Sequence, residues 1–443
     1  MAQSLVIRGG RVIDPASGRD EIADVLVEDG KIGAIGRLTP ADGANTFDAT
    51  DLLVIPGLID VHVHLREPGF EEKETIATGT AAAAAGGFTT IFCMPNTRPA
   101  LDNVDAILDL QQRIARDAVV RVHPIAAITL NRAGRDPVDF YGLARAGVVG
   151  FTDDGDTTAN SGIMRRALAA SGETGLPVIV HCEDKGLAMG SMHEGSVSRE
   201  LGLDGIPAAA EEIIIARDLM LAELAGGWLH ICHVTTGRGA DLIRQGKARG
   251  VQVTAEVMPH HLTMTDGWVA GSRTLVNVNE PPEAAGDPAD PNTKVNPPLR
   301  PAAETVNLLA ALRDGTIDLI ATDHAPHAVP EKSDSAFDRA AFGLSGLEFA
   351  VPLMLALVRA DQMSISDVVR YLSLTPARLW KLPGGHLSEG APADITVIDP
   401  EERWVVDRAT LSTKSANTPL LGMELQGRIK LTMVGGEVRF ASD

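Results

Sequence analysis

Short apolar runs alternate with longer amphipathic segments through the middle of the chain. Each run is almost continuously apolar, which is typical of strands buried on both faces. We predict strands at 58–64, 88–95, 121–129, 148–154, 176–184, 228–236, 251–259 and 317–326. Helical patterns separate them, for example at 71–87, 161–175 and 209–227. Eight successive strand–helix units predict an α/β fold built on a (β/α)8 barrel of the TIM type.

Both ends of the chain instead show short alternating strands with glycine turns. Near the N-terminus, the pairs Gly9-Gly10 and Asp29-Gly30 predict hairpins. Residues 393–440 repeat this β-rich texture. Because neither end is long enough for a core of its own, we predict that the two termini together build one small β-sandwich domain. The predicted domains are this composite unit, 1–56 plus 386–443, and the barrel, 57–385.

Two stretches fit neither pattern. Residues 277–293 are rich in Pro, Ala and acids, so we predict an exposed loop inserted after the seventh strand, whose role the sequence does not reveal. Residues 328–341 are polar and have no strong period. They suit either a mobile flap over the site or a static loop.

The composition excludes several classes of protein. With 59 acidic and 39 basic residues the net charge is −20, and aromatic residues make up only 4%. This leaves neither a basic stripe nor stacking platforms for nucleic acid. No apolar window approaches the roughly 18 residues of a membrane span, and the N-terminus lacks a signal-peptide pattern. The three cysteines, Cys93, Cys182 and Cys232, are predicted to be reduced thiols of a cytoplasmic protein.

Polar residues gather where the predicted strands end. His62 and His64 stand two residues apart at the end of the first strand, so alternation directs both to one side. The fourth, fifth, sixth and eighth strands end likewise, at Asp153-Asp154, His181, His230 and His233, and Asp323 and His327. Barrel enzymes hold their active sites at this end, and Zn²⁺ accepts imidazole and carboxylate ligands with one position open for water. The pattern predicts a metal-assisted hydrolytic centre.

Longer motifs narrow this prediction. They are DVHVHLREPG (60–69), MPNT (94–97), FTDDG (151–155), HCED (181–184), KVNPPLR (294–300) and ATDHAPH (321–327). Together they resemble the dihydroorotases of the bacterial type I class, within the amidohydrolase superfamily. The resemblance covers nearly the whole chain, including the split β-domain that flanks the barrel in this superfamily.

The resemblance implies a role for each candidate ligand. His62 and His64 would bind the more buried of two metal ions. His181 and His233 would bind the second ion. Asp323 would ligate the buried metal and also act as the general acid and base.

One feature departs from the wider superfamily. Many members bridge their two metals with a carboxylated lysine after the fourth strand, whereas here that strand ends in FTDDG. The resemblance places Asp154 in the bridging position and leaves Asp153 as a cap or supporting group. Because a plain carboxylate is shorter than a carboxylated lysine, we expect one tight Zn²⁺ and a second, weaker one. Strand alternation directs His230, Cys182 and Cys232 away from the site.

The substrates of such an enzyme are anions, so a cation must hold a carboxylate. Arg66, two residues past His64, can grip a carboxylate with two parallel hydrogen bonds. Asn96 can donate alongside it, and His327 can complete the clamp. By resemblance, the further substrate contacts are His64, Asn296 and the backbone at Phe342 and Gly343.

The resemblance implies a zinc-dependent dihydroorotase, which interconverts N-carbamoyl-L-aspartate and L-dihydroorotate in de novo pyrimidine biosynthesis. Two alternatives stay open. One is another cyclic amidohydrolase, acting on hydantoin, dihydropyrimidine or allantoin. The other is a non-catalytic dihydroorotase-like scaffold for aspartate transcarbamoylase, an enzyme that is also a candidate partner of an active chain. We expect a homo-oligomer with a small-molecule substrate and no nucleic-acid or membrane partner.

Overall fold

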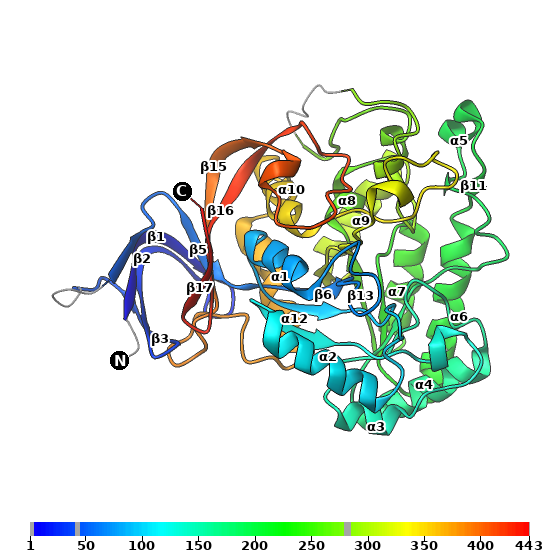
Figure 1. Cartoon of the computed structure of the whole chain (residues 1–443), viewed down its shortest axis with the longest axis horizontal. Helices are drawn as coiled ribbons and strands as arrows, with labels where there is room; N and C mark the ends of the chain where they lie inside the picture. Colours follow the sequence, from blue (N-terminus) through cyan, green and yellow to red (C-terminus); the bar gives the residue numbers. More distant parts are fainter. Residues whose placement is uncertain (1–3, 40–44, 279–284, 443) are drawn as a thin grey trace.

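Strands from both ends of the chain lie in one sheet, at the left of Figure 1. The computed structural model describes residues 4–39, 45–278 and 285–442. The strand order is β17-β16-β15-β5-β1-β2-β3, with β4 paired to β1. These strands are β1 (Leu5–Asp14), β2 (Arg19–Glu28), β3 (Lys31–Gly36), β4 (Asn45–Asp48), β5 (Leu53–Pro56), β15 (Ile395–Val405), β16 (Glu424–Val434) and β17 (Glu437–Ala441). The two ends of the chain join where β15 runs antiparallel to β5.

One of the two predicted hairpin turns is confirmed and the other is wrong. Asp29-Gly30 joins β2 to β3 with φ values of 50° and 74°, the left-handed backbone that such a turn needs. Gly9-Gly10 lies inside β1 instead, where the register with β2 shifts between Ile7 and Gly10. A Cβ on Gly10 would lie 2.5 Å from Val54 Cγ2. The glycine pair therefore permits a bulge and close packing on β5, not a turn.

Parallel strands form the centre of the larger part of the molecule. One sheet contains β6 (Leu58–Val63), β7 (Phe88–Cys93) and β8 (Arg121–Pro124). Another contains β9 (Val178–Val180), β12 (Leu229–Ile231), β13 (Val253–Val257) and β14 (Leu319–Ile320). Seven of the predicted strands are thereby confirmed, several of them shorter than expected.

Isolated parallel bridges connect these two sheets. Phe151 pairs with Ala126, just after β8, and with Val178 in β9, while Val63 in β6 pairs with His324, just after β14. This is the order of pairing that a closed eight-stranded barrel requires. The predicted strand at 148–154 consists only of the bridges at Phe151, and Gly150 interrupts the apolar run there.

Helices alternate with the parallel strands and surround them in Figure 1. The longer ones are α1 (Ile76–Ala85), α2 (Val104–Asp117), α4 (Ser161–Thr174), α6 (Ala209–Ala225), α7 (Gly237–Ala248), α9 (Ala302–Arg313) and α10 (Ala350–Arg359). The shorter ones are α3 (Phe140–Arg145), α5 (Ser196–Leu201), α8 (Pro259–Thr263), α11 (Ile365–Val369) and α12 (Thr375–Leu379). The three helices exemplified above are confirmed as α1, α4 and α6. α1 begins only at Ile76 because the Thr75 side chain accepts the Thr78 N–H and caps the helix.

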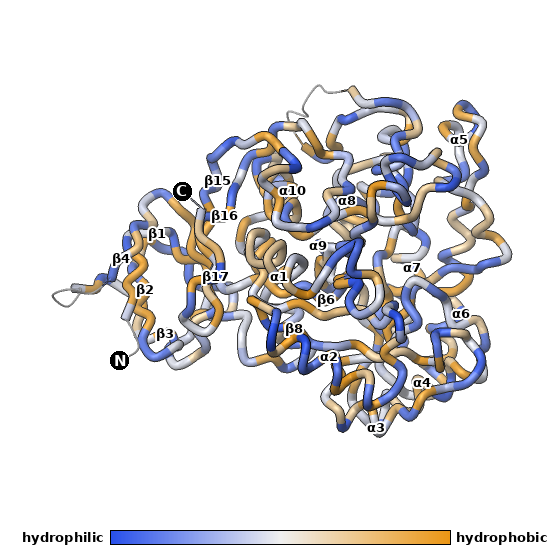
Figure 2. Tube along the Cα trace, viewed as in Figure 1, coloured by the Kyte–Doolittle hydropathy of each residue, from blue (hydrophilic) through white to orange (hydrophobic). Residues whose placement is uncertain are grey.

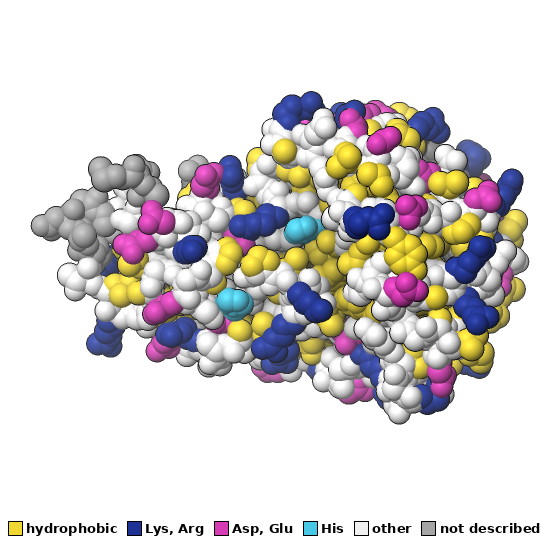
Figure 3. Space-filling view, turned by 90° about the horizontal axis from the view of Figure 1, so that it is seen from below, with side chains coloured by type: hydrophobic (Ala, Val, Ile, Leu, Met, Phe, Trp, Pro, Cys, Tyr) yellow, Lys and Arg dark blue, Asp and Glu magenta, His cyan; other side chains and the backbone are white. Residues whose placement is uncertain are grey.

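Apolar side chains from the parallel strands form a buried cluster within the strand layer. Its members include Ile59, Phe92, Ile125, Ile179, Met258 and Leu319. In Figure 2, hydrophobic residues follow strands such as β2, β17 and β6. On the face shown in Figure 3, acidic and basic side chains are interspersed. Among the described helices, none has both the length and the apolar character needed to cross a membrane.

The stretch 277–293 does follow the seventh predicted strand, β13. Residues 279–284 lie outside the described residues. The rest is mostly exposed or half-buried, as expected of a surface insert. A bridge from Ser272 to Ala285, the Ala289 N–H donated to the Val269 carbonyl oxygen at 2.7 Å, and the ion pair of Arg273 with Asp290 attach it.

Candidate metal centre and substrate cavity

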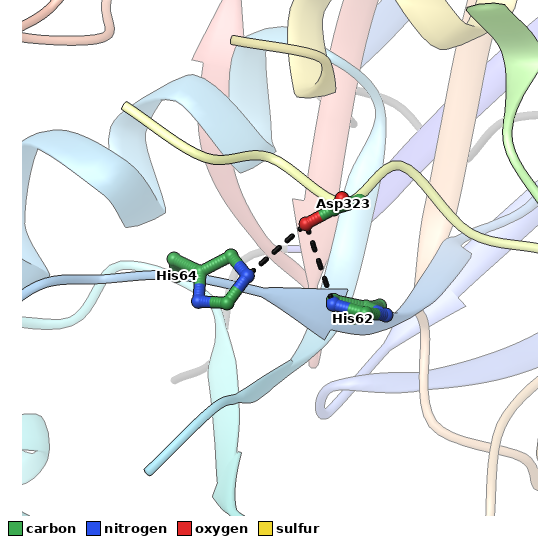
Figure 4. Close-up of side chains that lie close together, drawn as sticks. All are labelled: His62, His64 and Asp323. Carbon is green, nitrogen blue, oxygen red and sulfur yellow. Dashed lines mark hydrogen bonds and ion pairs between the residues drawn. The ribbon is translucent and has the colours of Figure 1, made fainter. Parts of the chain in front are cut away.

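Two histidines and an aspartate meet at the carboxyl ends of β6 and β14 (Figure 4). The Nε2 atoms of His62 and His64 lie 3.3 and 3.0 Å from Oδ1 of Asp323. Both rings therefore face the same group, as strand alternation predicts. The exposed fractions of the three side chains are 0%, 6% and 13%. Ligand atoms of all three lie within 4.8 Å of one another, so the group could hold a metal ion.

Asp154 lies between this group and a second pair of histidines. Its Oδ2 is 3.7 Å from His62 Nε2 and 3.5 Å from His64 Nε2. Its Oδ1 is 3.5 Å from His181 Nδ1 and 3.7 Å from His233 Nε2. The last two residues follow β9 and β12, and these two ring nitrogens are 3.0 Å apart. One carboxylate thus faces two histidine pairs, one with each oxygen.

The centre contains buried polar atoms that no described protein group satisfies. They include His62 Nε2, Asp154 Oδ1 and His233 Nδ1. Such an unpaired atom costs about 1–3 kcal/mol, so its presence calls for a ligand. Imidazole nitrogen and carboxylate oxygen are ligands of divalent metals such as Zn²⁺. The donor set therefore fits a metal ion.

A buried carboxylate that the sequence analysis did not assign orients His62. Glu256 in β13 is 1% exposed, with Oε1 2.6 Å from His62 Nδ1 and Oε2 3.1 Å from His230 Nε2. Burial opposes ionisation of Glu256, but the two histidines outweigh it and lower its pKa. His62 then directs Nδ1–H to Glu256 and Nε2 to Asp323. The sequence did contain a sign that Glu256 has a special role, because it is the only charged residue in the predicted strand 251–259.

Residues next to the candidate ligands have supporting positions. Asp153 accepts the N–H groups of Ile128 and Thr129 at 3.0 Å, so it secures the neighbouring loop. Cys232 does not lie as far from the site as alternation suggests. Its sulfur is within 4.8 Å of a ligand atom of His62. Burial raises the pKa of this thiol, so Cys232 packs beside His62 as a neutral group.

The residues predicted to bind substrate all line one cavity of about 330 Å³. They are His64, Arg66, Asn96, Asn296, His327, Phe342 and Gly343. The lining also includes Asp154, His181, His233 and Asp323. Candidate metal ligands and candidate substrate contacts therefore share one space.

Arg66 provides a fixed positive charge in this cavity. It is 8% exposed, and its Nε donates to the Pro326 carbonyl oxygen at 3.1 Å. Burial lowers the pKa of Arg66 to about 10, which leaves it charged at neutral pH. Its Nη2 lies 3.3 Å from His327 Nε2. Burial and then this guanidinium lower the pKa of His327 to about 2, so the imidazole is neutral.

The two asparagines of the cavity are held by neighbouring side chains. Asn96 Oδ1 lies 2.9 Å from His64 Nδ1, which leaves the amide hydrogens of Asn96 free to donate. Asn296 Nδ2 donates to Glu183 Oε1 at 2.8 Å. Burial raises the pKa of Glu183, but His181 and Lys185 outweigh it and lower the value to about 2. Glu183 belongs to the HCED motif, in which the sequence predicted a role only for His181. In the structure the ionised Glu183 carboxylate orients Asn296.

A buried amide joins the loops around the cavity. Asn417, from the segment before β16, is 2% exposed. Its Oδ1 accepts the His327 N–H at 3.0 Å, and its Nδ2 donates to the carbonyl oxygens of Ala325 and Gly343 at 3.1 and 3.2 Å. No local pattern in the sequence marks this residue, because its partners lie 74 to 92 positions away.

Lys332 anchors the stretch 328–341. Its side chain is fully buried, and Nζ donates to the carbonyl oxygens of Lys294 and Ala341, each at 2.7 Å. The hydrogen bond to Ala341 lies within the stretch, and the hydrogen bond to Lys294 connects the stretch to the KVNPPLR loop. These contacts favour the static loop over the mobile flap.

Comparisons with known proteins agree on the family. A model of dihydro-orotase-like proteins matches residues 51–238. A dihydroorotase of Pelotomaculum thermopropionicum is 49% identical over 436 residues, 98% of each chain. The chain belongs to the dihydroorotase family. Another dihydroorotase, of Syntrophus aciditrophicus, is 43% identical over 99% of this chain and 100% of its own.

Solved structures of this architecture extend beyond the dihydroorotase family. An L-hydantoinase (dihydropyrimidinase) from Arthrobacter aurescens superposes with a TM-score of 0.84 at 26% identity, over 99% of this chain and 96% of its own. The span matched by the dihydro-orotase-like model contains both histidine pairs and Asp154, whereas Asp323 lies beyond it. The full-length relatives extend the similarity over that part.

Proposed function

We propose that this chain is a dihydroorotase that interconverts N-carbamoyl-L-aspartate and L-dihydroorotate. The observation that supports this most directly is a single cavity in which Asp154 faces two histidine pairs and Arg66 supplies a buried positive charge. A cyclic amide with a carboxylate needs both features, one for hydrolysis and one for recognition. Relatives named dihydroorotase match the chain over its whole length.

The metal that we propose is zinc, at two positions. His62, His64 and Asp323 would hold one ion, His181 and His233 would hold the other, and Asp154 would contribute to both. When bound, the metal supplies a water of lowered pKa and polarises the amide carbonyl. Because Asp154 is an unmodified carboxylate, we expect one position to bind tightly and the other to exchange.

Asp323 is the proposed general acid and base. Its side chain is 13% exposed and lines the cavity, whereas that of Asp154 is 3% exposed. In ring opening, Asp323 accepts a proton from the attacking water and delivers it to the departing ring nitrogen. In ring closure the path is reversed, so Asp323 accepts the proton of the attacking ureido nitrogen and delivers it to the departing oxygen, which leaves as water.

Arg66 and Asn96 are the proposed holders of the substrate carboxylate. A buried guanidinium forms charge-assisted hydrogen bonds that a neutral side chain cannot replace. His327 completes this clamp as a neutral imidazole, and Asn296 with the backbone at Phe342 and Gly343 contacts the ring. The clamp favours a cyclic amide that has a carboxylate over one that lacks it.

Two other functions make different predictions. A hydantoinase-like activity is suggested by the L-hydantoinase fold relative, but its neutral substrates would leave Arg66 without a partner. A scaffold for aspartate transcarbamoylase would not need four histidines gathered around the Asp154 carboxylate. We retain that enzyme as a proposed binding partner of the active chain, and a homo-oligomer as the proposed assembly.

The proposed architecture follows from the strand pairings. Residues 57–385 would form a closed (β/α)8 barrel, since the bridges at Phe151 and Val63 connect its two sheets in barrel order. Residues 1–56 and 386–443 would form the composite β-sandwich domain, since strands of both termini share one sheet.

A substrate panel on the zinc-loaded chain tests the function. We expect turnover of L-dihydroorotate and little or none of hydantoin, dihydrouracil or allantoin. Arg66→Gln should lower kcat/KM for L-dihydroorotate at least about tenfold, since a buried hydrogen bond to a charged group contributes about 1.5–3 kcal/mol. Arg145→Gln, at an exposed position on α3, is the matched control. Equal turnover of dihydrouracil, unaffected by Arg66→Gln, would overturn the proposal.

A further inference from the structure

A second cavity adjoins the first and has a strongly basic lining. It measures about 400 Å³ and shares Arg66 and Asn96 with the substrate cavity. Lys73, Arg98 and Arg132 add three more cations, and no Asp or Glu belongs to its described lining. We call this space the vestibule.

The charges around the vestibule do not balance. Lys73 Nζ pairs with Glu331 Oε1 at 2.9 Å, and Arg132 Nη2 pairs with Asp156 Oδ2 at 2.9 Å. Arg98 is exposed, and among the described residues it has no ion-pair partner. Its guanidinium lies over the Phe70 ring, 5.3 Å from the centroid, and Lys73 Nζ lies 5.0 Å from the same centroid. The Phe70 ring therefore places the unpaired Arg98 guanidinium close to the Lys73 ammonium, which is paired with Glu331.

Two of the cations that line the vestibule, Arg132 and Arg66, are also fixed in place. Arg132 donates from Nε and Nη2 to the carbonyl oxygen of Asp153 at 3.3 and 3.1 Å. Asn131 and Arg132 both have positive φ, 54° and 55°, a backbone conformation that is uncommon for residues other than glycine. Arg66 is bound to the Pro326 carbonyl oxygen. A built, cationic cavity of this kind attracts small anions.

We propose that the vestibule binds the dianionic acyclic substrate before it enters the metal centre, with Arg98 as its unpaired cation. This inference rests on the proposed function. N-carbamoyl-L-aspartate has two carboxylates and L-dihydroorotate has one, while the chain has a net charge of −20. The molecule as a whole repels the dianion more strongly, so a local cationic entrance matters most for ring closure.

Steady-state kinetics in both directions test the vestibule. Arg98→Gln should raise KM for N-carbamoyl-L-aspartate about two- to fivefold, the range of a partly exposed ion pair, with kcat unchanged. KM for L-dihydroorotate should change less, and the difference should shrink at high ionic strength. Arg98→Lys keeps the positive charge, so its KM for N-carbamoyl-L-aspartate should stay close to the wild-type value. Arg145→Gln should change KM for neither substrate. Equal changes for both substrates, or a loss in kcat alone, would overturn the proposal.

A binding measurement separates this inference from the proposed function. If the wild-type chain turns over neither substrate, the proposed function fails, and calorimetric titration with succinate then decides on the vestibule. Weaker succinate binding to Arg98→Gln than to wild type supports a dicarboxylate site. Equal binding, or binding of inorganic phosphate without succinate, excludes a dicarboxylate site there.

Discussion

Replacing Glu256 by glutamine isolates the contribution of a residue that touches no substrate. Glu256→Gln keeps the shape of the side chain but removes the negative charge that faces His62 Nδ1 at 2.6 Å and His230 Nε2 at 3.1 Å. At 1% exposure no water can replace that charge. The glutamine oxygen can still accept the His62 Nδ1–H, but His62 loses the negative charge that makes its Nε2 a stronger metal ligand.

Loss of such a supporting carboxylate lowers metal affinity by about 10–100-fold, which corresponds to about 1.4–2.8 kcal/mol. We expect Glu256→Gln to fall in this range, and turnover at limiting zinc to fall with it. Competition with a chelator of known zinc affinity measures the change. Turnover should recover in part at high zinc concentration, because Asp323 and the substrate contacts are unaltered.

The matched control is Asp218→Asn, another buried carboxylate, which pairs with Arg217 on α6. Circular dichroism establishes that both variants fold. A zinc affinity for Glu256→Gln within about twofold of wild type would refute the reasoning. So would an equal loss of affinity in Asp218→Asn, since the effect would then be a general consequence of removing a buried charge.

Further predictions concern the second ion, the loops and the stability. After dialysis the wild-type chain should retain one tight zinc and bind a second exchangeably, and Asp154→Asn should lose the second; two tight equivalents by metal analysis would contradict this. Asn417→Ala should raise KM for L-dihydroorotate at least about fivefold, because it leaves buried loop groups unpaired at about 1–3 kcal/mol each; an unchanged KM would show that the loops hold without it. Burial raises the pKa of Glu348 from 4.5 to about 7, so the folded chain retains a proton that the unfolded chain releases. Stability should therefore fall as pH rises from about 4.5 to 7, by up to about 3 kcal/mol. Melting curves of Glu348→Gln should lack that fall, and a parallel pH profile would contradict the assignment.

The sequence predicted the parallel strands and the positions of the histidines because both depend on local periodicity. Apolar runs mark strands buried on both faces, and residues at the ends of parallel strands meet at one edge of the sheet. His62 and His64 could thus be placed together with Asp323 without any knowledge of distances. The motifs then named residues such as Asn296, which periodicity alone would not single out.

The remaining features depend on contacts between distant segments. Gly9-Gly10 has the composition of a turn, but the neighbouring Val54 makes it a bulge. Glu256 is an odd charge in an apolar strand until His62 is seen beside it. Asn417 belongs to the C-terminal part of the chain and still orders loops around the cavity. Pairings across such separations have no local signature in one sequence.

We propose that Asp323 and the histidine cluster catalyse the reversible hydrolysis of L-dihydroorotate. The most direct measurement follows ring opening of L-dihydroorotate and ring closure of N-carbamoyl-L-aspartate by the zinc-loaded chain, beside Asp323→Asn. We expect the wild-type chain to turn over both compounds and the folded Asp323→Asn variant to turn over neither. Turnover that survives in Asp323→Asn would contradict the role of Asp323, and no turnover by a wild-type chain with zinc bound would contradict the proposed reaction.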